Sequence, residues 1–162
     1  MAHVNAQRPL AHVPGYIRLP GPIIRRLLRL GLPIGPNMLL TVRGRVSGKS
    51  YSYPLAVMEL DGRRWVIGTF GDTNWCRNMR ANPEVELRHR GRVENVRARE
   101  LTPSEATDFF VNTLPIAVAR MPLSGRLASR AFIGFAAPEI KTDPTLAGLQ
   151  RPVFELQQLE AK

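Results

Sequence analysis

Residues 44–49 are the part of the sequence best suited to bind a charged group. They read Gly-Arg-Val-Ser-Gly-Lys, which places one hydroxyl and the two cations of Arg45 and Lys49 on a flexible backbone. Such a segment can cradle a phosphate, because amides, hydroxyls and cations are the usual partners of that group. The spacing is not that of a Walker loop, and no helix is expected directly after it. An ordinary glycine-rich β-turn on a basic surface is the alternative interpretation.

Three further segments follow this turn at short intervals. Residues 52–55 read Ser-Tyr-Pro-Leu, residues 67–70 read Ile-Gly-Thr-Phe, and residues 74–83 read Asn-Trp-Cys-Arg-Asn-Met-Arg-Ala-Asn-Pro. In this order, from Gly-Arg-x-Ser-Gly to Trp-x-x-Asn-x-x-Ala-Asn-Pro, the chain resembles the deazaflavin-dependent nitroreductase family. Members of that family use the reduced deazaflavin coenzyme F-420 as a hydride donor. The resemblance covers roughly residues 36–107, and the combination is far more specific than any single motif.

The resemblance implies a fold and a set of cofactor contacts. The fold is a split β-barrel of the FMN-binding-like type, mainly β with flanking helices (α+β). The glycine-rich turn would hold the phosphate-bearing tail of coenzyme F-420, two strands would line its ring, and a short helix would close the site. The positions expected to contact the cofactor are Arg45, Val46, Ser47, Gly48, Lys49, Tyr51, Ser52, Tyr53, Pro54, Leu55, Ala56, Ile67, Gly68, Thr69, Phe70, Asn74, Trp75, Cys76, Arg77 and Asn78.

Three positions that are commonly basic in the family are not basic here. They are occupied by Val46, Tyr51 and Phe70. The cations that could replace them come from other positions, namely Lys49, Arg77 and Arg80. Binding of flavin mononucleotide (FMN) or haem by the same fold is therefore kept as an alternative.

The expected reaction is hydride transfer to a small hydrophobic molecule such as a quinone, a nitroaromatic or an enone. Hydride transfer needs no protein nucleophile, so an enzyme without a Ser-His-Asp or paired-carboxylate signature is consistent with it. Thr69 stands at a serine position of the family and is the predicted catalytic residue, because a hydroxyl can stabilise charge on the acceptor oxygen. Phe132 and Phe135 are expected to form an apolar lid.

Some residues in these motifs have a purely structural interpretation as well. Trp75 on a short amphipathic helix can be a core anchor, a role that is compatible with a ring contact. Cys76 is interpreted as a small buried hydrophobe, because the chain has no second cysteine to resolve an oxidised one. The three histidines are dispersed, and no metal site is expected.

Short β-forming segments between Met38 and Arg99 must position these residues. Asp61-Gly62 lies between two such segments and predicts a two-residue hairpin turn. A second hairpin is predicted around Gly91, and a final strand over residues 153–156.

Helices are predicted around the strands. Residues 22–32 form a basic amphipathic helix, and a short helix at residues 75–81 bridges the two hairpins before Asn82-Pro83 stops it. Thr102-Pro103-Ser104-Glu105 combines an N-cap, a first-turn proline and a capping glutamate, so a helix should run to about Asn112. Residues 114–137 are mixed and could be helical with loops.

The composition is that of one globular domain spanning residues 1–162, with a leader over residues 1–21. The 162 residues carry a formal charge of +10 and one cysteine. A single cysteine suits a reducing compartment, so a cytoplasmic protein is expected, without a signal peptide or a spanning helix. Split barrels commonly dimerise, which makes a homodimer an expectation from the fold alone.

The positive charge leaves a binding module without catalysis as a different class of function. The basic helix could dock at an anionic membrane surface, which would place the protein at the inner membrane face near lipid-soluble acceptors. The stretch 88–92 could contact nucleic acid, but it falls on a predicted hairpin tip and no nucleic-acid-binding motif accompanies it. Nucleic-acid binding is therefore the weakest of these hypotheses.

Overall fold

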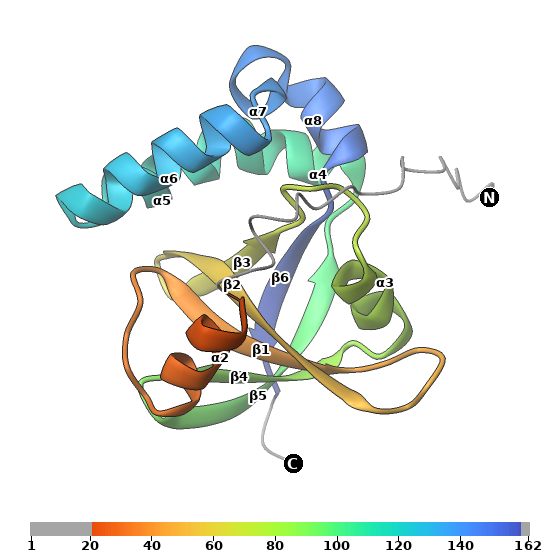
Figure 1. The fold of residues 1–162 in the computed structure, drawn as a ribbon. Coiled ribbons are helices and arrows are strands. Elements are labelled where there is room, and N and C mark those ends of the chain that lie inside the picture. The colour runs from red at the N-terminus through yellow and green to blue at the C-terminus, as the bar shows by residue number, and fades with distance from the viewer. Residues whose placement is uncertain (1–20, 160–162) are drawn as a thin grey trace.

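Six antiparallel strands form a closed barrel in the computed structural model, which describes residues 21–159 (Figure 1). The order around the barrel is β1-β2-β3-β6-β5-β4, and β4 pairs with β1 to close it. The last strand of the chain is therefore inserted between β3 and β5. The strands are β1 (Asn37–Arg43), β2 (Ser50–Leu60), β3 (Arg63–Ile67), β4 (Glu84–His89), β5 (Arg92–Glu100) and β6 (Val153–Gln158). The predicted final strand and the mainly β class with flanking helices are confirmed.

Both predicted hairpins are present with two-residue turns. Asp61 and Gly62 connect β2 to β3, and their φ angles of 50° and 77° are both positive, as a type I′ turn requires. Arg90 and Gly91 connect β4 to β5 with φ angles of 49° and 77°. The right-handed twist of paired strands favours this turn type, which fixes the register of both pairs.

The barrel interior is filled by alternate residues of the strands. The buried set includes Leu40 and Val42 of β1, Val66 of β3 and Phe154 of β6, each at most 1% exposed. Helix α3 (Asn74–Ala81) adds Trp75, Cys76 and Met79 to the same cluster. The helix between the hairpins is thus held by burial in the barrel core, as its position in the sequence predicts.

A layer of helices covers the outer face of β2, β3 and β6 at one end of the barrel (Figure 1). Trp65 of β3 and Val153 of β6 are buried there together with Phe109. These residues belong to a second hydrophobic cluster, which is separate from the cluster inside the barrel. The ring centroids of Trp65 and Phe109 are 5.4 Å apart. The helices of this layer are α4 (Pro103–Asp108), α5 (Leu114–Ala119), α6 (Leu123–Ala136), α7 (Glu139–Thr142) and α8 (Pro144–Gln150).

The helix that starts at Thr102 runs further than predicted. Thr102 caps α4 with the expected capping box, and its side chain accepts from the Glu105 N–H. The expected end near Asn112 is wrong, because a π-helical segment, η1 (Phe109–Thr113), continues directly into α5. Pro115 has no N–H to donate, and the wider π turn accommodates it without ending the helix.

Helix α2 (Gly21–Arg29) confirms the predicted basic helix and packs on β1, β2 and β4, but the predicted end at residue 32 is wrong, because the chain turns at Gly31 with a φ angle of 82°. Leu28 is its buried anchor, at 3% exposure. The expected leader lies almost entirely outside the described residues. None of the helices within residues 21–159 has the length and apolar composition needed to cross a bilayer.

Candidate cofactor site

The turn at residues 44–49 joins β1 to β2 and is closed by its own hydrogen bonds. The Gly44 N–H donates to the Lys49 carbonyl at 2.8 Å. Ser47 Oγ lies 3.0 Å from the Tyr51 hydroxyl and also accepts from the Lys49 N–H at 3.3 Å. The side chains of both cations in the turn remain exposed.

Helix α3 fixes this turn through one buried amide. Asn78 is 4% exposed, and its Oδ1 accepts from the Arg45 guanidinium at 2.8 Å and from the Arg45 N–H at 3.2 Å. One turn later, Asn82 Nδ2 donates to the Arg43 carbonyl at 3.1 Å. Asn78 and Asn82 thereby attach the α3 helix to the start of the predicted phosphate-binding segment, at Arg45 and at the preceding Arg43.

Tyr53 belongs to the same group of side chains. Burial and the neighbouring Tyr51 raise the pKa of its phenol, while Arg45 and a hydrogen bond with Asn78 act in the opposite direction. The net result is a raised pKa, so Tyr53 is a neutral hydroxyl at physiological pH. It can donate or accept a hydrogen bond beside the Arg45 cation.

The basic residues near this site differ in how far their charge is matched. Arg77 Nε lies 3.3 Å from Asp72 Oδ2, and Arg80 NH1 lies 2.6 Å from Asp72 Oδ1. Arg80 also pairs with a second carboxylate, and these hydrogen bonds raise its pKa. Within the described part of the chain, Arg45 and Lys49 form no ion pair with a carboxylate. Of the cations expected to replace the missing family cations, Arg77 and Arg80 are paired with carboxylates, whereas Lys49, like Arg45, keeps a charge that no described carboxylate matches.

The expected contacts on β2 are divided between two faces of the sheet. Tyr53 and Leu55 pack against the barrel core, whereas Ala56 packs against the helical cluster. Ser52 Oγ lies 2.8 Å from Thr41 Oγ1 on the neighbouring strand. Consecutive side chains of a strand point to opposite faces, so residues 51–56 cannot all present side chains to one ligand.

The loop after β3 holds Thr69 in a tight turn. The Gly68 N–H donates to the Pro152 carbonyl at 2.7 Å, and a Cβ at Gly68 would lie 2.9 Å from the Gly71 carbonyl oxygen. The Thr69 carbonyl accepts from Arg151 NH1 at 2.6 Å. Among residues 21–159, no hydrogen bond uses the Thr69 hydroxyl, which is half-buried and therefore available to a ligand.

Two aromatic rings meet next to Thr69. The Phe70 and Phe132 centroids are 5.9 Å apart at 79°, an edge-to-face contact between this loop and α6. Phe135 lies one turn further along α6 and is 68% exposed. The helical layer thus brings the expected lid residue Phe132 to the end of β3, although 62 positions separate it from Phe70 in the sequence.

The remaining predicted contacts on α3 lie mostly inside the barrel. Trp75 is 7% exposed and its ring centroid is 5.9 Å from that of Phe154, which is the core-anchor arrangement. Cys76 is fully buried, and desolvation raises the pKa of its thiol to about 12. Only the backbone of these two residues could reach a cofactor outside the barrel. Asn74, at the start of the helix, is exposed.

Some residues of the site were missed from the sequence. Arg151, which supports Thr69, lies in a segment with no recognisable motif, so no local signal could have found it. Asn82 was interpreted only as a helix stop, although its amide also holds the strand that precedes the turn. Asp72 precedes the helix, and no local pattern indicates that its carboxylate pairs with two arginines, Arg77 and Arg80.

The donor set fits an anionic cofactor with a planar ring. The exposed turn offers two unmatched cations and a hydroxyl, the usual partners of phosphate and carboxylate groups. The loop and strand residues near Thr69 supply aromatic and aliphatic walls of the kind that ring-binding sites use. The described residues contain no group of three metal-ligating side chains.

The closed barrel and this site define a split-barrel oxidoreductase of the flavin and deazaflavin class. Residues 12–120 match the family model described as F-420H(2)-dependent quinone reductase. The chain belongs to this family. It is accordingly an oxidoreductase, and its cofactor is coenzyme F-420.

Solved structures with related folds include proteins of several kinds. A structure described as an F-420-H2 dependent reductase (FDR-A) is 27% identical, with a TM-score of 0.49, over 75% of this chain and 94% of that chain. An FAD-binding protein from Mesorhizobium loti is 18% identical, with a TM-score of 0.46, over 85% of this chain and 87% of that chain. A heme binding protein from Mycobacterium smegmatis is 14% identical, with a TM-score of 0.43, over 75% of this chain and 46% of that chain.

Proposed function

We propose that residues 44–49 hold the anionic tail of coenzyme F-420 and that the acceptor is a small hydrophobic molecule such as a quinone, a nitroaromatic or an enone. The observation that carries the proposal is the double hydrogen bond from Arg45 to Asn78. It orients a guanidinium without neutralising it, because an amide oxygen carries no net charge. Lys49 adds a second unmatched cation on the same turn.

The bound coenzyme in its reduced form supplies a hydride. The protein then has to orient two planar molecules and exclude water. Pro54 and the backbone of Leu55 on β2, together with the Gly68-Thr69 segment, would support the ring, and Phe70 with Phe132 would provide an apolar wall for the acceptor. Stacked or edge-on aromatic contacts suit a flat, electron-poor acceptor.

Thr69 is the residue that we propose touches the acceptor. Its hydroxyl is not engaged with other described residues, and its carbonyl is held by Arg151. A hydroxyl fixed beside the acceptor can donate to the oxygen on which negative charge develops. The Thr69 hydroxyl, at the end of β3, would in this way stabilise the negative charge that develops on the acceptor oxygen.

The test is a titration of the protein with oxidised coenzyme F-420, followed by fluorescence. Saturable binding that the Arg45→Ala/Lys49→Ala variant weakens at least about tenfold supports the proposal, since each lost charge-assisted contact is worth roughly 1.5–3 kcal/mol. Arg92→Ala/Arg97→Ala removes the same charge from β5 and serves as the control. If both variants lose the same affinity for coenzyme F-420, the loss comes from the overall charge of the protein, and the proposal for residues 44–49 is contradicted.

Parallel titrations with FMN and with haem address the alternative cofactors. Tighter binding of either FMN or haem than of coenzyme F-420 would contradict the proposal that residues 44–49 hold the tail of coenzyme F-420.

A homodimer stays a prediction from the fold.

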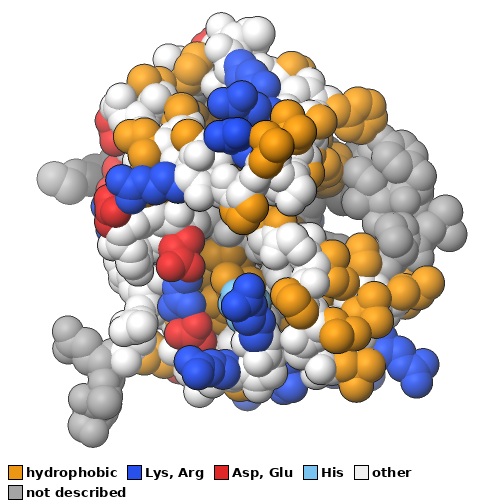
Figure 2. Space-filling view, turned by 90° about the vertical axis from the view of Figure 1, so that its left-hand side faces the viewer, with side chains coloured by type: hydrophobic (Ala, Val, Ile, Leu, Met, Phe, Trp, Pro, Cys, Tyr) orange, Lys and Arg blue, Asp and Glu red, His pale blue; other side chains and the backbone are white. Residues whose placement is uncertain are grey.

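A membrane-docking role is a second proposal, supported by the position of α2. A Cβ at Gly31 would lie 3.2 Å from the Gly91 N atom, so the end of α2 and the β4–β5 turn form one continuous surface. Ile23 of α2 and Leu30, which directly follows the helix, are 67% and 71% exposed, and Arg25, Arg26 and Arg29 belong to the same helix. Figure 2 shows hydrophobic and basic side chains next to each other on the lower part of this side of the molecule. Such a mixture suits an anionic lipid surface.

A further inference from the structure

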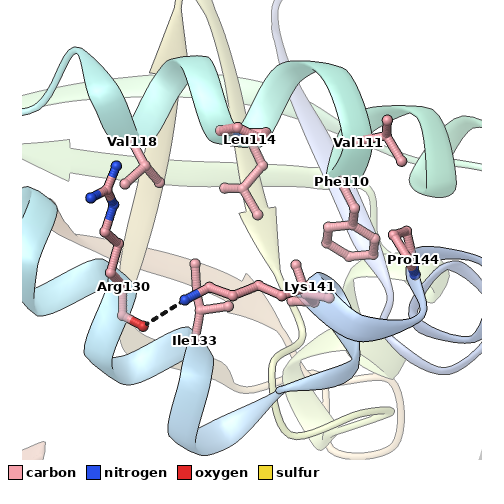
Figure 3. A pocket seen from close by; sticks show the side chains of 10 residues that line it. Phe110, Val111, Leu114, Val118, Arg130, Ile133, Lys141 and Pro144 are labelled. Carbon is pink, nitrogen blue, oxygen red and sulfur yellow. Dashed lines mark hydrogen bonds between the residues drawn. The ribbon is translucent and has the colours of Figure 1, made fainter.

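A cavity of about 380 Å³ lies between the η1–α5 segment on one side and α6–α7 on the other (Figure 3). Its walls are mainly apolar and include Phe110, Leu114, Val118 and Ile133. None of the residues predicted to hold the cofactor lines it. The volume lies within the range of small-molecule sites, roughly 300–1,000 Å³.

Two cations border this apolar space. Lys141 reaches across from α7 towards α6, where its Nζ donates to the Arg130 carbonyl at 3.4 Å, and the Arg130 side chain lies on the same side (Figure 3). Both side chains are exposed, which places them at the mouth of the cavity. Across residues 21–159, neither forms an ion pair with a carboxylate.

The acidic groups close to these cations in the sequence are engaged elsewhere. Glu139 pairs with Arg151. Asp143 Oδ1 accepts from the Leu146 N–H at 3.0 Å and caps α8. The mouth of the cavity therefore presents positive charge that the described part of the protein does not match.

The π-helical segment contributes to the cavity wall. Phe110 of η1 is buried and Val111 is 50% exposed at the edge. π-helical turns are rare and often occur at functional sites, although Pro115 alone explains why one forms here. The apolar walls and the two cations are therefore the features of this cavity that could recognise a ligand.

We propose that the cavity binds the carboxylate form of a medium-chain aliphatic acid, with the chain among the apolar walls and the carboxylate between Arg130 and Lys141. A water molecule takes about 30 Å³ of liquid volume and a methylene group is of similar size, so the cavity holds on the order of ten heavy atoms. Burial of such a chain gives affinity, and the cations select an anionic head group. This site goes beyond the proposed function and does not depend on it.

The experiment is isothermal titration calorimetry of the protein without coenzyme F-420, using decanoate below its micelle concentration. One-to-one saturable binding is expected. Decan-1-ol tests the contribution of the charge, and butyrate tests that of the chain. Decanoate should bind at least about tenfold more tightly than either, because two charge-assisted contacts or most of the buried apolar area are then lost.

Two variants separate the cations from the walls. Arg130→Gln/Lys141→Gln should weaken decanoate at least about tenfold while changing decan-1-ol by less than about twofold. Val111→Trp should fill the cavity and abolish binding of both ligands, whereas Ile116→Trp, at an exposed position of α5 outside the cavity, should leave both unchanged. Arg97→Gln/Arg126→Gln removes two positive charges outside the cavity and is the matched charge control.

The outcomes are decisive in both directions. No saturable decanoate binding, an unchanged affinity in the double variant, or full binding by Val111→Trp would overturn the proposal. Thermal unfolding of each variant shows whether it is folded. A Val111→Trp protein that unfolds is replaced by Val111→Phe, which fills less space at the same exposed position.

Discussion

Asn78 Oδ1 accepts two hydrogen bonds from one residue, Arg45, through the guanidinium at 2.8 Å and the backbone N–H at 3.2 Å. The helix between the hairpins thereby sets the direction in which the cation of the β1–β2 turn points. Neither residue could orient the turn alone, because 33 positions separate them in the sequence and only the folded barrel brings them together.

Replacing Asn78 tests whether this contact preserves the charge of Arg45. Asn78→Asp should keep the geometry but add a carboxylate to Arg45, and the affinity for coenzyme F-420 should fall about 5- to 20-fold. Asn78→Ala should lower the free energy of unfolding by about 1–3 kcal/mol, because two hydrogen bonds from Arg45 to a buried amide are lost. Urea unfolding and coenzyme titration measure the two effects separately. An Asp variant with unchanged affinity would remove Arg45 from the binding site.

Thr69→Val should lower kcat/KM for a quinone acceptor by about 10- to 100-fold, since a hydroxyl that stabilises a developing negative charge is lost without loss of volume. Affinity for coenzyme F-420 should change little. Thr69→Ser keeps the hydroxyl and is expected to retain most of the activity. The assignment fails if Thr69→Val and Thr69→Ser are equally active in steady-state assays.

Glu155 should make the stability of the protein sensitive to acid. Burial acts to raise its pKa, but hydrogen bonds from Arg63 at 2.7 Å and Arg99 at 3.1 Å outweigh burial, and the pKa is lowered. A carboxyl with a lowered folded-state pKa contributes stability above its unfolded pKa of about 4.3 and loses it as the pH falls through the folded value.

Glu155→Gln should therefore cost about 1–3 kcal/mol of unfolding free energy at pH 7 and less below pH 4, where the wild-type carboxyl begins to be protonated. Urea unfolding at both pH values gives the comparison. Glu84→Gln, an exposed position on β4, is the control for loss of one negative charge. A cost that is the same at both pH values would show that the ion pairs are not the cause.

Cys76 should be unreactive in the folded protein. Desolvation raises the pKa of its thiol to about 12, so the thiolate that reacts with alkylating agents is scarce at pH 8, and the side chain is fully buried. Labelling with iodoacetamide should follow unfolding, with complete modification in urea and little in buffer after the same time. Rapid labelling in buffer would mean that α3 leaves the barrel readily.

Basic residues of α2 should mediate binding to anionic vesicles. Arg25→Gln/Arg26→Gln/Arg29→Gln should reduce sedimentation with phosphatidylserine vesicles at least about tenfold, as each cation near such a surface is worth roughly 1 kcal/mol. Arg97→Gln/Arg120→Gln/Arg126→Gln removes equal charge elsewhere. Binding of the wild type should also decrease as salt is added. Equal binding by both triple variants would contradict docking through α2.

The sequence predicted the hairpins because their turns are local. Asp61-Gly62 and the segment around Gly91 carry residues that tolerate positive φ, and β-forming segments flank both. The capping box at Thr102 fixed the start of α4 for a similar reason. The continuation of that helix was not predicted, because a proline usually ends a helix, whereas here a π-helical segment before Pro115 carries the chain directly into α5.

The order of motifs from Arg45 to Asn78 determined the family and the cofactor, since both depend on which residue types follow one another along the chain. Only the tertiary structure decided which cations keep unmatched charge. Arg77 and Arg45 look equivalent in the sequence, but Asp72 neutralises the first while the neutral amide of Asn78 orients the second. The cavity between η1 and α6 could not be predicted from any sequence motif either. Its walls come from separate helices, and only the packing of these helices against one another brings the walls together.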